Sequence, residues 1–401
     1  MSLKVLQINT VYGYGSTGKI AKDIASECES RGIECKVAHR YLETEKPLPN
    51  SYQVSSYFDC HVHNRIARMT HLTGCFSRIK TARFLKKVDE YAPDIIHLHN
   101  LHGNYINVPM LFKYIKKRNI PVIWTLHDCW SFTGGCPYYD MQQCADWKRG
   151  CNNCPKQKKL VSSCTMWRKK KNWFSNVKNM LIVTPSAWLA DQVGQSFLKD
   201  YPVTVINNGI SLEIFKPRES DFAKRYSCED KRIVLGVALE WEERKGIDVF
   251  LKLAKRLDEN EYQIVLVGTN DEIEKVLPKN IISIHKTQDQ IELAEIYTAA
   301  SVFVNPTRED NFPTVNIEAL ACGTPVVTFK TGGSPEIIDD TCGEVVARDD
   351  FDAMRNAIIR ICDGNFSREA CILRAMRYER KSKFKEYVDL YENREGTNID
   401  K

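Results

Sequence analysis

The sequence predicts an α/β fold made of two Rossmann-like, doubly wound domains that face a central cleft. Short apolar strand patterns alternate with helical patterns along the chain, as is typical of parallel sheets. The 401 residues exceed what one hydrophobic core usually supports. The hydrophobic pattern also gives way to a polar connection at residues 206–218 and then restarts. We therefore expect an N-terminal, acceptor-side domain over residues 1–206, a C-terminal domain over 207–375, and a final helical segment, 376–401, that packs back on the first domain.

The N-terminal half begins with a βαβ pattern. An apolar strand is expected at residues 4–9, followed by a Gly-rich turn that contains Gly15 and Gly18, and then by a helix that begins at Ile20. The turn has the spacing of a phosphate-binding P-loop, but Ile20 stands where such a loop needs Ser or Thr. We therefore interpret it as a Gly-rich loop whose backbone approaches a sugar or a phosphate.

Residues 43–75 show no clear periodicity, so we expect irregular structure there. His61 and His63 lie in this stretch, and no neighbouring side chain completes a metal-ligand set, which favours loop histidines. Helices are expected over residues 76–90 and 108–117.

Two buried strands of this half end in polar side chains. The strand that begins at residue 93 leads to His99 and His102, and the strand that begins at residue 121 leads to His127 and Asp128. Carboxyl ends of parallel strands share one edge of a sheet, so these four side chains should lie at the same edge. Histidines of a core would lie within the strands instead, and the placement therefore predicts a functional site.

The loop over residues 129–164 contains four closely spaced cysteines: Cys136, Cys144, Cys151 and Cys154. A Cys-x2-Cys pair with two further thiolates suits a tetrahedral structural zinc. Disulfides and free thiols are the alternatives, and Cys129 and Cys164 are candidate additional ligands. The remaining cysteines are scattered, as expected of reduced thiols in a cytosolic protein. We expect the loop to shape the acceptor side of the cleft.

Charge is distributed unevenly along the chain. The first 205 residues carry a formal net charge of +14 and the remainder carries −8. The strongest basic patch interleaves lysines with aromatic residues between Trp167 and Trp173 and includes Lys156, Lys158 and Lys159. Such a patch suits an anionic membrane surface, and we rank this above nucleic acid because no base-reading module accompanies it.

No apolar run is long enough to cross a membrane, and the first residues lack the pattern of a secretory signal. We therefore expect a cytoplasmic protein that binds peripherally to the cytoplasmic face of the inner membrane and has no nucleic-acid partner.

The second half repeats the strand–helix alternation, with strands expected at residues 232–238, 262–267, 301–305 and 325–329, and with helices at 246–257, 290–299 and 314–322. Its most informative stretch is Thr307–Pro325, in which Asp310 and Glu318 flank the start of a helix. Free N–H groups at a helix N-terminus attract anions, and nearby carboxylates accept hydroxyl protons. The combination predicts a site for a phosphorylated sugar or a nucleotide.

These residues resemble the GT-B-fold glycosyltransferases of the large retaining family four, in the branch that assembles bacterial polysaccharides such as capsules. The resemblance covers nearly the whole chain, and its motifs are the Gly-rich first loop, His127-Asp128, Asn208-Gly209-Ile210, Arg244-Lys245-Gly246, Asp310-Asn311-Phe312-Pro313 and the segment from Glu318 to Val327. It implies a retaining hexosyl- or N-acetylhexosaminyl-transferase. The donor would be a UDP- or GDP-sugar, the acceptor would be lipid-linked or an oligosaccharide, and catalysis would require no cofactor.

The resemblance also assigns roles. Asp310 and Glu318 keep the seven-residue separation of the family's paired-glutamate motif, with Glu309 one residue out of register. Asp310, or the backbone after it, would hold donor-sugar hydroxyls, Glu318 would accept hydrogen bonds from the ribose, and Lys245 would pair with the diphosphate. The catalytic set implied in this way is His127, Arg244, Lys245 and Asp310. The donor-binding set is Gly15, Gly18, Asp128, Asn311, Phe312, Thr314 and Glu318.

One position departs from the family pattern. The arginine usually found six residues before the lysine is Leu239 here, and Arg244 is the candidate replacement. No Asp-x-Asp motif follows a strand, which agrees with metal-independent catalysis. Two alternatives stay open: a nucleotide-sugar 2-epimerase of the same fold, and a non-catalytic, membrane-docked nucleotide-sugar binder.

Overall fold

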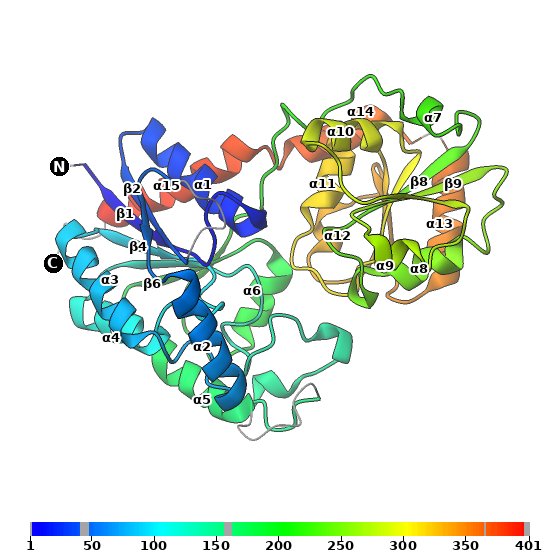
Figure 1. Cartoon of the computed structure of the whole chain (residues 1–401). Coiled ribbons are helices and arrows are strands. Elements are labelled where there is room, and N and C mark those ends of the chain that lie inside the picture. The colour runs from blue at the N-terminus through cyan, green and yellow to red at the C-terminus, as the bar shows by residue number, and fades with distance from the viewer. Residues whose placement is uncertain (1, 41–47, 156–162, 365, 397–401) are drawn as a thin grey trace. The chain divides into compact units, whose positions relative to one another are not determined.

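The computed structural model describes residues 2–40, 48–155, 163–364 and 366–396. It divides into two α/β units (Figure 1). The first unit comprises the chain up to Asn207 together with the residues from Lys383 onward, and the second unit is Asn208–Ser382.

The first unit is built on a seven-stranded sheet in which every recorded strand pair is parallel. Its strands are β1 (Lys4–Ile8), β2 (Glu34–His39), β3 (Ser51–Gln53), β4 (Ile95–Leu98), β5 (Val122–Thr125), β6 (Met180–Thr184) and β7 (Val203–Val205). Its helices are α1 (Gly15–Ser30), α2 (Tyr57–Thr70), α3 (Arg78–Tyr91), α4 (Val108–Arg118), α5 (Ser163–Phe174) and α6 (Ala187–Gly194), with 3-10 turns η1 (Asp140–Gln142) and η2 (Asp146–Lys148).

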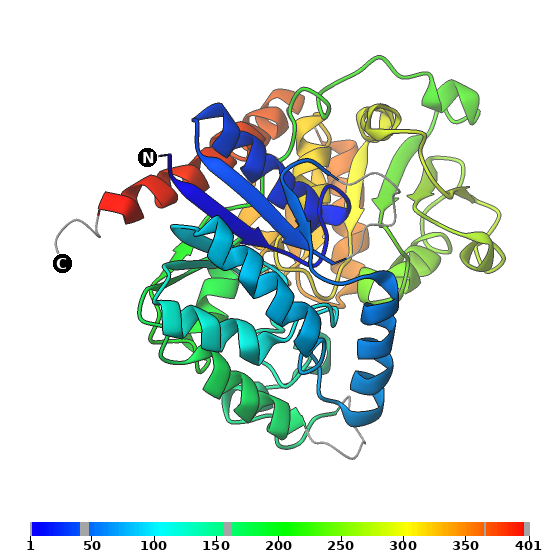
Figure 2. The same ribbon diagram turned by 60° about the vertical axis from the view of Figure 1, so that its left-hand side comes forward.

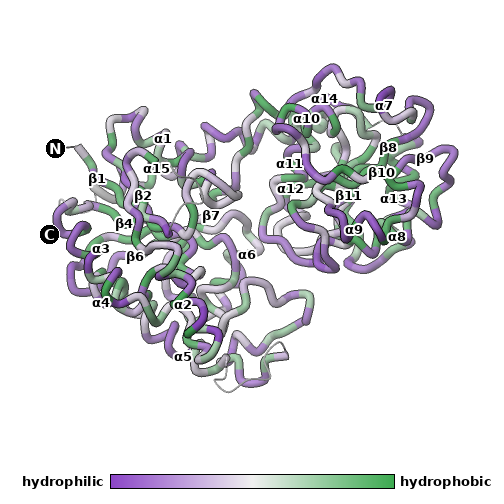
Figure 3. The backbone as a smooth tube through the Cα atoms, viewed as in Figure 1, coloured by the Kyte–Doolittle hydropathy of each residue, from purple (hydrophilic) through white to green (hydrophobic). Residues whose placement is uncertain are grey.

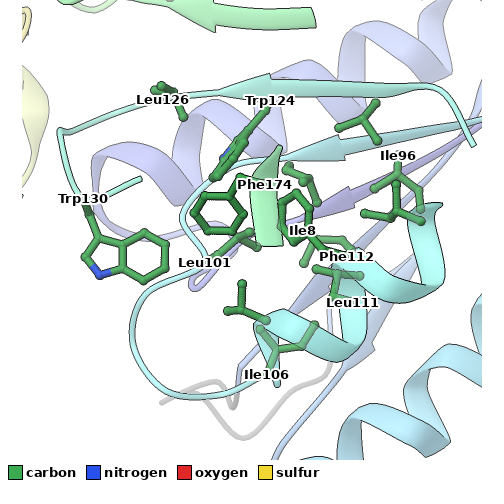
Figure 4. Packing of buried hydrophobic residues seen from close by; sticks show 14 of the residues in the cluster. Ile8, Ile96, Leu101, Ile106, Leu111, Phe112, Trp124, Leu126, Trp130 and Phe174 are labelled. Carbon is green, nitrogen blue, oxygen red and sulfur yellow. The ribbon is translucent and has the colours of Figure 1, made fainter. Parts of the chain in front are cut away.

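The strand order of the first sheet is β3-β2-β1-β4-β5-β6-β7. The order reverses between β1 and β4, and ligands bind at the carboxyl ends of the strands beside such a switch point. Below this edge lies an aromatic cluster in which Phe112 of α4, Trp124 of β5 and Phe174 of α5 have ring centroids 4.6–5.5 Å apart (Figure 4). The cluster anchors the end of β5, and truncating such a buried ring to Ala costs roughly 3–5 kcal/mol of stability.

Two expectations about this unit were wrong. Helix α1 begins at Gly15 rather than Ile20, so the Gly-rich turn forms the first turn of the helix. Residues 43–75 are not irregular throughout, because α2 spans Tyr57–Thr70. This helix begins with a capping box, in which Ser56 Oγ accepts from the Asp59 N–H and the Asp59 carboxylate accepts from the Ser56 N–H. The Ser-x-x-Asp sequence was therefore a helix signal that the absence of periodicity concealed.

His61 and His63 lie on α2 rather than in a loop. His61 is exposed, whereas His63 is buried, and the N–H of Phe76 donates to its Nε2 at 3.1 Å. His63 therefore ties α2 to the segment before α3, and its role here is structural.

The last helix, α15 (Arg380–Gly396), lies beside α1 and β1 in two views (Figures 1 and 2). From it, Phe384, Tyr387, Val388 and Tyr391 enter a buried cluster with residues of β1 and α1. Arg31 at the end of α1 also donates to Asp389 at 2.8 Å. The C-terminal helix thus completes the hydrophobic core of the first unit.

The second unit contains a six-stranded parallel sheet in the order β10-β9-β8-β11-β12-β13. Its strands are β8 (Arg232–Val237), β9 (Tyr262–Val267), β10 (Ile281–Ile284), β11 (Val302–Asn305), β12 (Val326–Phe329) and β13 (Gly343–Val346). Its helices are α7 (Phe222–Arg225), α8 (Ile247–Leu253), α9 (Asp271–Glu274), α10 (Gln290–Ala299), α11 (Thr314–Ala321), α12 (Ser334–Ile337), α13 (Phe351–Asp363) and α14 (Arg368–Met376), with the 3-10 turn η3 (Glu243–Lys245).

Hydrophobic side chains line both faces of this sheet and form two buried clusters. The strands accordingly run through the apolar interior of the unit, while the peripheral connections are largely hydrophilic (Figure 3). The strand order reverses between β8 and β11, so the loops that follow these two strands are the ones placed to bind a ligand. In the described part of the chain, no helix combines the length and apolar character needed to cross a membrane.

Candidate functional site

The four polar side chains expected at the edge of the first sheet lie together there as two pairs. His99 Nδ1 is 3.0 Å from His127 Nε2, and the two rings stack with centroids 5.3 Å apart. His102 Nε2 is 2.8 Å from Asp128 Oδ2. The ends of β4 and β5 therefore bring the four groups into one constellation, as predicted.

A hydrogen-bond chain determines the protonation pattern of the first pair. The amide nitrogen of Gln7, on β1, donates to Ala21 O at 3.0 Å and to Cys35 Sγ, so its oxygen faces His99 Nε2 at 2.9 Å. His99 must then carry its proton on Nε2 and accept at Nδ1. His127 consequently donates from Nε2, and its Nδ1 keeps a lone pair that can accept a hydrogen bond.

Burial keeps these histidines neutral. His97, two residues before His99 on β4, is fully buried. Its Nδ1 is 2.6 Å from the Tyr391 hydroxyl, and its Nε2 is 2.8 Å from the Thr125 hydroxyl. Desolvation lowers the pKa of His97 to about 3 and that of His127 to about 4, and it lowers the pKa of His99 well below the ordinary value. Sequence reasoning missed His97 and Gln7, which lie inside strands and give no signal as strand-end residues do.

Asp128 is the charged member of this edge. Burial opposes its ionisation, but His102 and the N–H of Trp130, which donates to Asp128 Oδ1 at 2.8 Å, hold the pKa of Asp128 below its ordinary value. The edge therefore presents the Asp128 carboxylate beside imidazoles, of which burial keeps those of His99 and His127 neutral.

The carboxyl edge of the second sheet carries formal charges instead. Lys245, at the end of η3, donates from Nζ to Asp310 Oδ2 at 2.7 Å, and each side chain is about a fifth exposed. Arg244 bonds the Glu242 carboxylate at 2.8 Å and donates to Glu309 O at 3.2 Å. The structure thus brings together three of the residues expected to be catalytic. It also shows that Asp310, rather than Glu309, offers its carboxylate to the lysine.

Arg308 holds this arrangement in place and was not anticipated. Its guanidinium bonds both oxygens of Asp248 at 2.7 and 2.8 Å and Asp349 at 2.6 Å, while its backbone N–H donates to Arg244 O at 2.8 Å. Hydrogen bonds to Asp248 raise the pKa of Arg308, so the charge is permanent. The side chain therefore clamps the turn that contains Lys245 onto the loop that contains Asp310.

Two glycines allow the loops to approach so closely. Gly246 has φ of +80°, and a Cβ there would lie 2.4 Å from Pro306 O. Gly332 has φ of +50°, and a Cβ there would lie 1.7 Å from Asp310 O. Any side chain at either position would push the Lys245 turn or the Asp310 loop out of place.

Helix α11 follows the Asp310 loop along the chain. Thr314 is its first residue, Asn311 and Phe312 are buried just before it, and its N-cap residue, Pro313, makes no side-chain capping bond. Glu318 is half-buried on the helix, where Tyr297 donates to its Oε2 at 3.3 Å. The first-turn N–H groups and Glu318 therefore lie on the short helix that the sequence identified.

The buried amide of Asn316 was missed by sequence reasoning. Its oxygen accepts from Asn305 at 2.7 Å, while its Nδ2 has no hydrogen-bond partner among the described residues. Leu239, at the position of the family arginine, is 98% exposed and supplies no substitute for that cation.

In the first unit, Gly15 and Gly18 both lie in the first turn of α1. Gly18 is buried, and its carbonyl accepts from the Gly13 N–H at 2.9 Å. A Cβ at Gly18 would meet Val11 and the Gly13 backbone at 3.1–3.3 Å, so this glycine serves the packing of the turn.

The expectation of one exposed basic and aromatic patch around Trp167–Trp173 was wrong in part. Lys170 is fully buried on α5, where Nζ donates to Trp130 O at 2.6 Å and lies 3.6 Å from the centre of the Trp130 ring. Trp167 donates to Trp147 O at 2.7 Å. The helix period turns these side chains inward and leaves Arg168, Lys169 and Lys171 facing outward. Lys156, Lys158 and Lys159 lie outside the described residues.

The four clustered cysteines line one pocket together with Asp146, Trp147 and Ser163. None of them is in a disulfide, and Cys129 and Cys164 are not part of the lining. Among the described residues, three metal-type ligand atoms come within 4.8 Å of one another only at Asp271, Glu274 and His285, which are exposed.

Comparison with known proteins places both halves of the chain. The family described as Glycosyltransferase Family 4 matches residues 17–214, and the family described as Glycosyl transferases group 1 matches residues 231–363. The chain is also similar to WcaC of Escherichia coli K12, whose name describes a glycosyl transferase of colanic acid biosynthesis. The two are 22% identical over 418 residues, which cover 98% of this chain and 100% of WcaC.

Solved structures show the same architecture. Sucrose-phosphate synthase of Thermosynechococcus elongatus superposes with a TM-score of 0.72 at 18% identity, covering 98% of this chain and 100% of that one. HepE of Anabaena, solved in complex with UDP-glucose, superposes with a TM-score of 0.66 at 14% identity, covering 98% and 100%. At these identities the likeness establishes the fold.

Proposed function

The chain belongs to glycosyltransferase family four and has the GT-B fold, and from this premise we propose that it transfers a sugar, with retention, from a nucleoside diphosphate sugar to a lipid-linked or oligosaccharide acceptor in surface polysaccharide synthesis. The observation that carries the proposal is the Lys245–Asp310 pair at the switch point of the second sheet, held by the Arg308 clamp beside the start of α11. The pair places a cation that can bind a diphosphate beside a carboxylate that can bind sugar hydroxyls.

The chemistry follows from the charge that the reaction develops. Cleaving the bond between the sugar and the nucleoside diphosphate leaves negative charge on the diphosphate. Lys245, Arg244 and the first-turn N–H groups of α11 are suited to stabilise that charge, since prepositioned donors act without reorganisation. Removal of one such donor typically costs about 2.7–4 kcal/mol of transition-state stabilisation. No resident metal is needed for this step, because the cations belong to the protein.

Asp310 has a second use once a donor binds. The diphosphate would compete for Lys245, and the released carboxylate, with the backbone of Asn311 and Phe312, would accept hydrogen bonds from sugar hydroxyls. Glu318 would do the same for the ribose. With retention in this fold, the departing diphosphate takes the acceptor proton, so Asp310 acts by binding rather than as a nucleophile.

The edge of the first sheet contributes neutral acceptors and one carboxylate. The neutral His127 imidazole, with Asp128 beside it, is suited to bind a sugar hydroxyl. The first turn of α1, with Gly15 and Gly18, adds backbone N–H groups. The net positive charge of the first 205 residues supports an anionic acceptor such as a lipid-linked diphosphate at the cytoplasmic membrane surface.

The donor is proposed to be a UDP- or GDP-sugar. HepE, solved with UDP-glucose, supports a uridine nucleotide, and WcaC supports a role in polysaccharide assembly. Both are inferences from relatives, and each is open to direct measurement.

A donor panel tests the proposal. UDP-, GDP- and ADP-sugars are incubated with the protein, and slow hydrolysis, anomeric configuration and melting temperature are recorded with and without EDTA. A transferase hydrolyses its donor slowly with retention in the presence of EDTA. An epimerase would convert the sugar at C2, and a binder would raise the melting temperature without turnover. If no donor is hydrolysed and none raises the melting temperature, the proposal fails.

A further inference from the structure

The loop between β5 and α5 has little regular structure of its own. Over residues 129–155 it contains only the 3-10 turns η1 and η2, and its backbone takes positive φ at Gly135, Gln143, Gly150 and Cys151. Yet Trp130, Phe132, Tyr139 and Trp147 in this loop are buried. Segments of this length with so little regular structure are uncommon in compact domains, and a cross-link would hold such a segment in one conformation.

We propose that Cys136, Cys144, Cys151 and Cys154 bind a structural zinc ion that cross-links this loop. The four side chains come from three separate turns of the loop and still line a single pocket. Four thiolates, two of them in a Cys-x2-Cys pair, form the donor set typical of closed structural zinc sites. The proposal concerns the loop alone and does not depend on the proposed transferase activity.

Two N–H groups at the pocket are placed to donate to sulfur. The N–H of Gly134 donates to Cys151 Sγ at 3.2 Å. Trp147 also lines the pocket and is 1% exposed, and its indole N–H has no hydrogen-bond partner among the described residues. A buried donor without an acceptor is costly, and metal-bound sulfur accepts such N–H groups as outer-shell partners.

The charges near the loop also favour a zinc thiolate centre. A zinc ion with four thiolates carries a net charge of −2. Lys170 is a fully buried lysine that bonds Trp130 O and Thr133 O of the same loop; burial lowers its pKa to about 7, whereas Asp128, Cys151 and Cys136 lie within electrostatic reach and favour its charged form. A buried cation requires an opposing charge nearby. The zinc thiolate centre would share that role with Asp128.

Zinc binding requires the four cysteine sulfurs to lie closer together than they do in the structure. No three of these sulfurs lie mutually within 4.8 Å in the structure, whereas four sulfurs about 2.3 Å from one ion are closer together than that. Zinc binding therefore requires the four sulfurs to move closer together. Asp146, which also lines the pocket, is engaged in accepting the Asn153 N–H at 2.7 Å and is not counted as a ligand.

Elemental analysis of the full-length protein, purified without chelator or metal-affinity resin, tests the inference. We expect about one equivalent of zinc in the wild type, less than a tenth as much in Cys151→Ser, and an unchanged content in Cys362→Ser, which alters a half-buried cysteine of α13. Equal zinc in the wild type and Cys151→Ser would overturn the proposal. A disulfide within the cluster, detected by mass spectrometry, would do so as well.

A second measurement covers the case in which the cysteine variant fails to fold. X-ray absorption by zinc in the wild-type protein should show a shell of sulfur neighbours at about 2.3 Å. A shell of nitrogen and oxygen alone would exclude the cysteine site. Replacing zinc with cobalt should give the visible bands of a tetrahedral thiolate complex, and their absence from a cobalt-loaded protein would also count against it.

Discussion

The carboxyl edges of the two sheets are built from opposite chemistry. The first edge gathers histidines that burial keeps neutral, linked by hydrogen bonds from Gln7 to His127. The second edge gathers fixed charges, with Lys245 on Asp310 and Arg308 between two aspartates. Eight of the nine histidines belong to the first unit, and the ninth, His285, is exposed in the second.

The difference shows how one topology can carry two kinds of site. The histidine edge suits uncharged hydroxyls, which it would recognise by the direction of its hydrogen bonds. The charged edge suits a diphosphate, and the Arg308 clamp holds it because unsupported lysine and arginine side chains are mobile. The same reversal of strand order therefore supports either chemistry, and the side chains at the strand ends decide which.

The largest expected effect comes from the charged edge of the second sheet. Lys245→Ala should lower turnover about 10²–10³-fold, because one prepositioned cation for the leaving diphosphate is lost. Donor turnover and circular dichroism measure activity and fold. Lys255→Ala, an exposed lysine of the same unit, is the matched control and should leave turnover unchanged. Retained activity in Lys245→Ala would remove this residue from the site.

Acid should weaken the first unit before the second. Burial lowers the pKa of His63 to about 4 and of His97 to about 3, so both stay neutral in the fold while the unfolded chain takes up protons below its ordinary pKa of 6.5. The free energy of unfolding is therefore unaffected by these two histidines above about pH 6.5. It falls as the pH is lowered toward 4, by about 1.4 kcal/mol per pH unit for each histidine.

Hydrogen exchange at pH 7.5, 6 and 5 measures this separately in each unit. Protection in β4 and β5 should fall on acidification more steeply than protection in β8 and β11. Equal losses in the two sheets would contradict the contrast between the edges.

Breaking the histidine chain should have a smaller effect. His99→Phe removes the acceptor for His127 Nε2–H, and the loss of one hydrogen bond should lower turnover roughly 3–10-fold. Nitrogen NMR of labelled histidine should show His127 as the Nε2–H tautomer in the wild type and a mixture in the variant. His61→Ala, at an exposed histidine of α2, should change neither. An Nδ1–H tautomer in the wild type would contradict the assigned chain.

The smallest effect should come from adding the missing cation. Leu239→Arg removes a side chain that is 98% exposed, so stability should not fall, and the new charge should tighten binding of a nucleoside diphosphate about 2–5-fold. Titration calorimetry measures this, with Leu373→Arg as the matched exposed control. Unchanged affinity would show that position 239 lies outside the charged edge in this chain.

The sequence predicted the features that depend on local pattern. Alternating strand and helix signals indicated two parallel-sheet units, and strand-end positions identified His99, His102, His127 and Asp128 as neighbours. The separation between Asp310 and Glu318 placed both acids around the start of α11. Helix α2 was also encoded locally, in the Ser56-x-x-Asp59 capping box, although it was overlooked.

Other features depend on residues that are far apart in the sequence. The clamp joins Arg308 to Asp248 and Asp349, which are 60 and 41 residues away. The Gln7–His99 bond spans 92 residues, and Lys170 is buried because its helix face packs on the Trp130 loop. Such contacts leave no local pattern, since their energy appears only when the elements meet.

The sequence by itself thus determined the two sheets and the polar side chains at their strand ends, and the resemblance to the family supplied the register of the Asp310–Glu318 pair. Period and spacing are local properties, which explains why these could be predicted. Only the tertiary structure decided which histidines stay neutral and which charges pair, because desolvation and ion pairing depend on what surrounds a side chain. The neutral histidines and the clamped lysine are therefore consequences of packing.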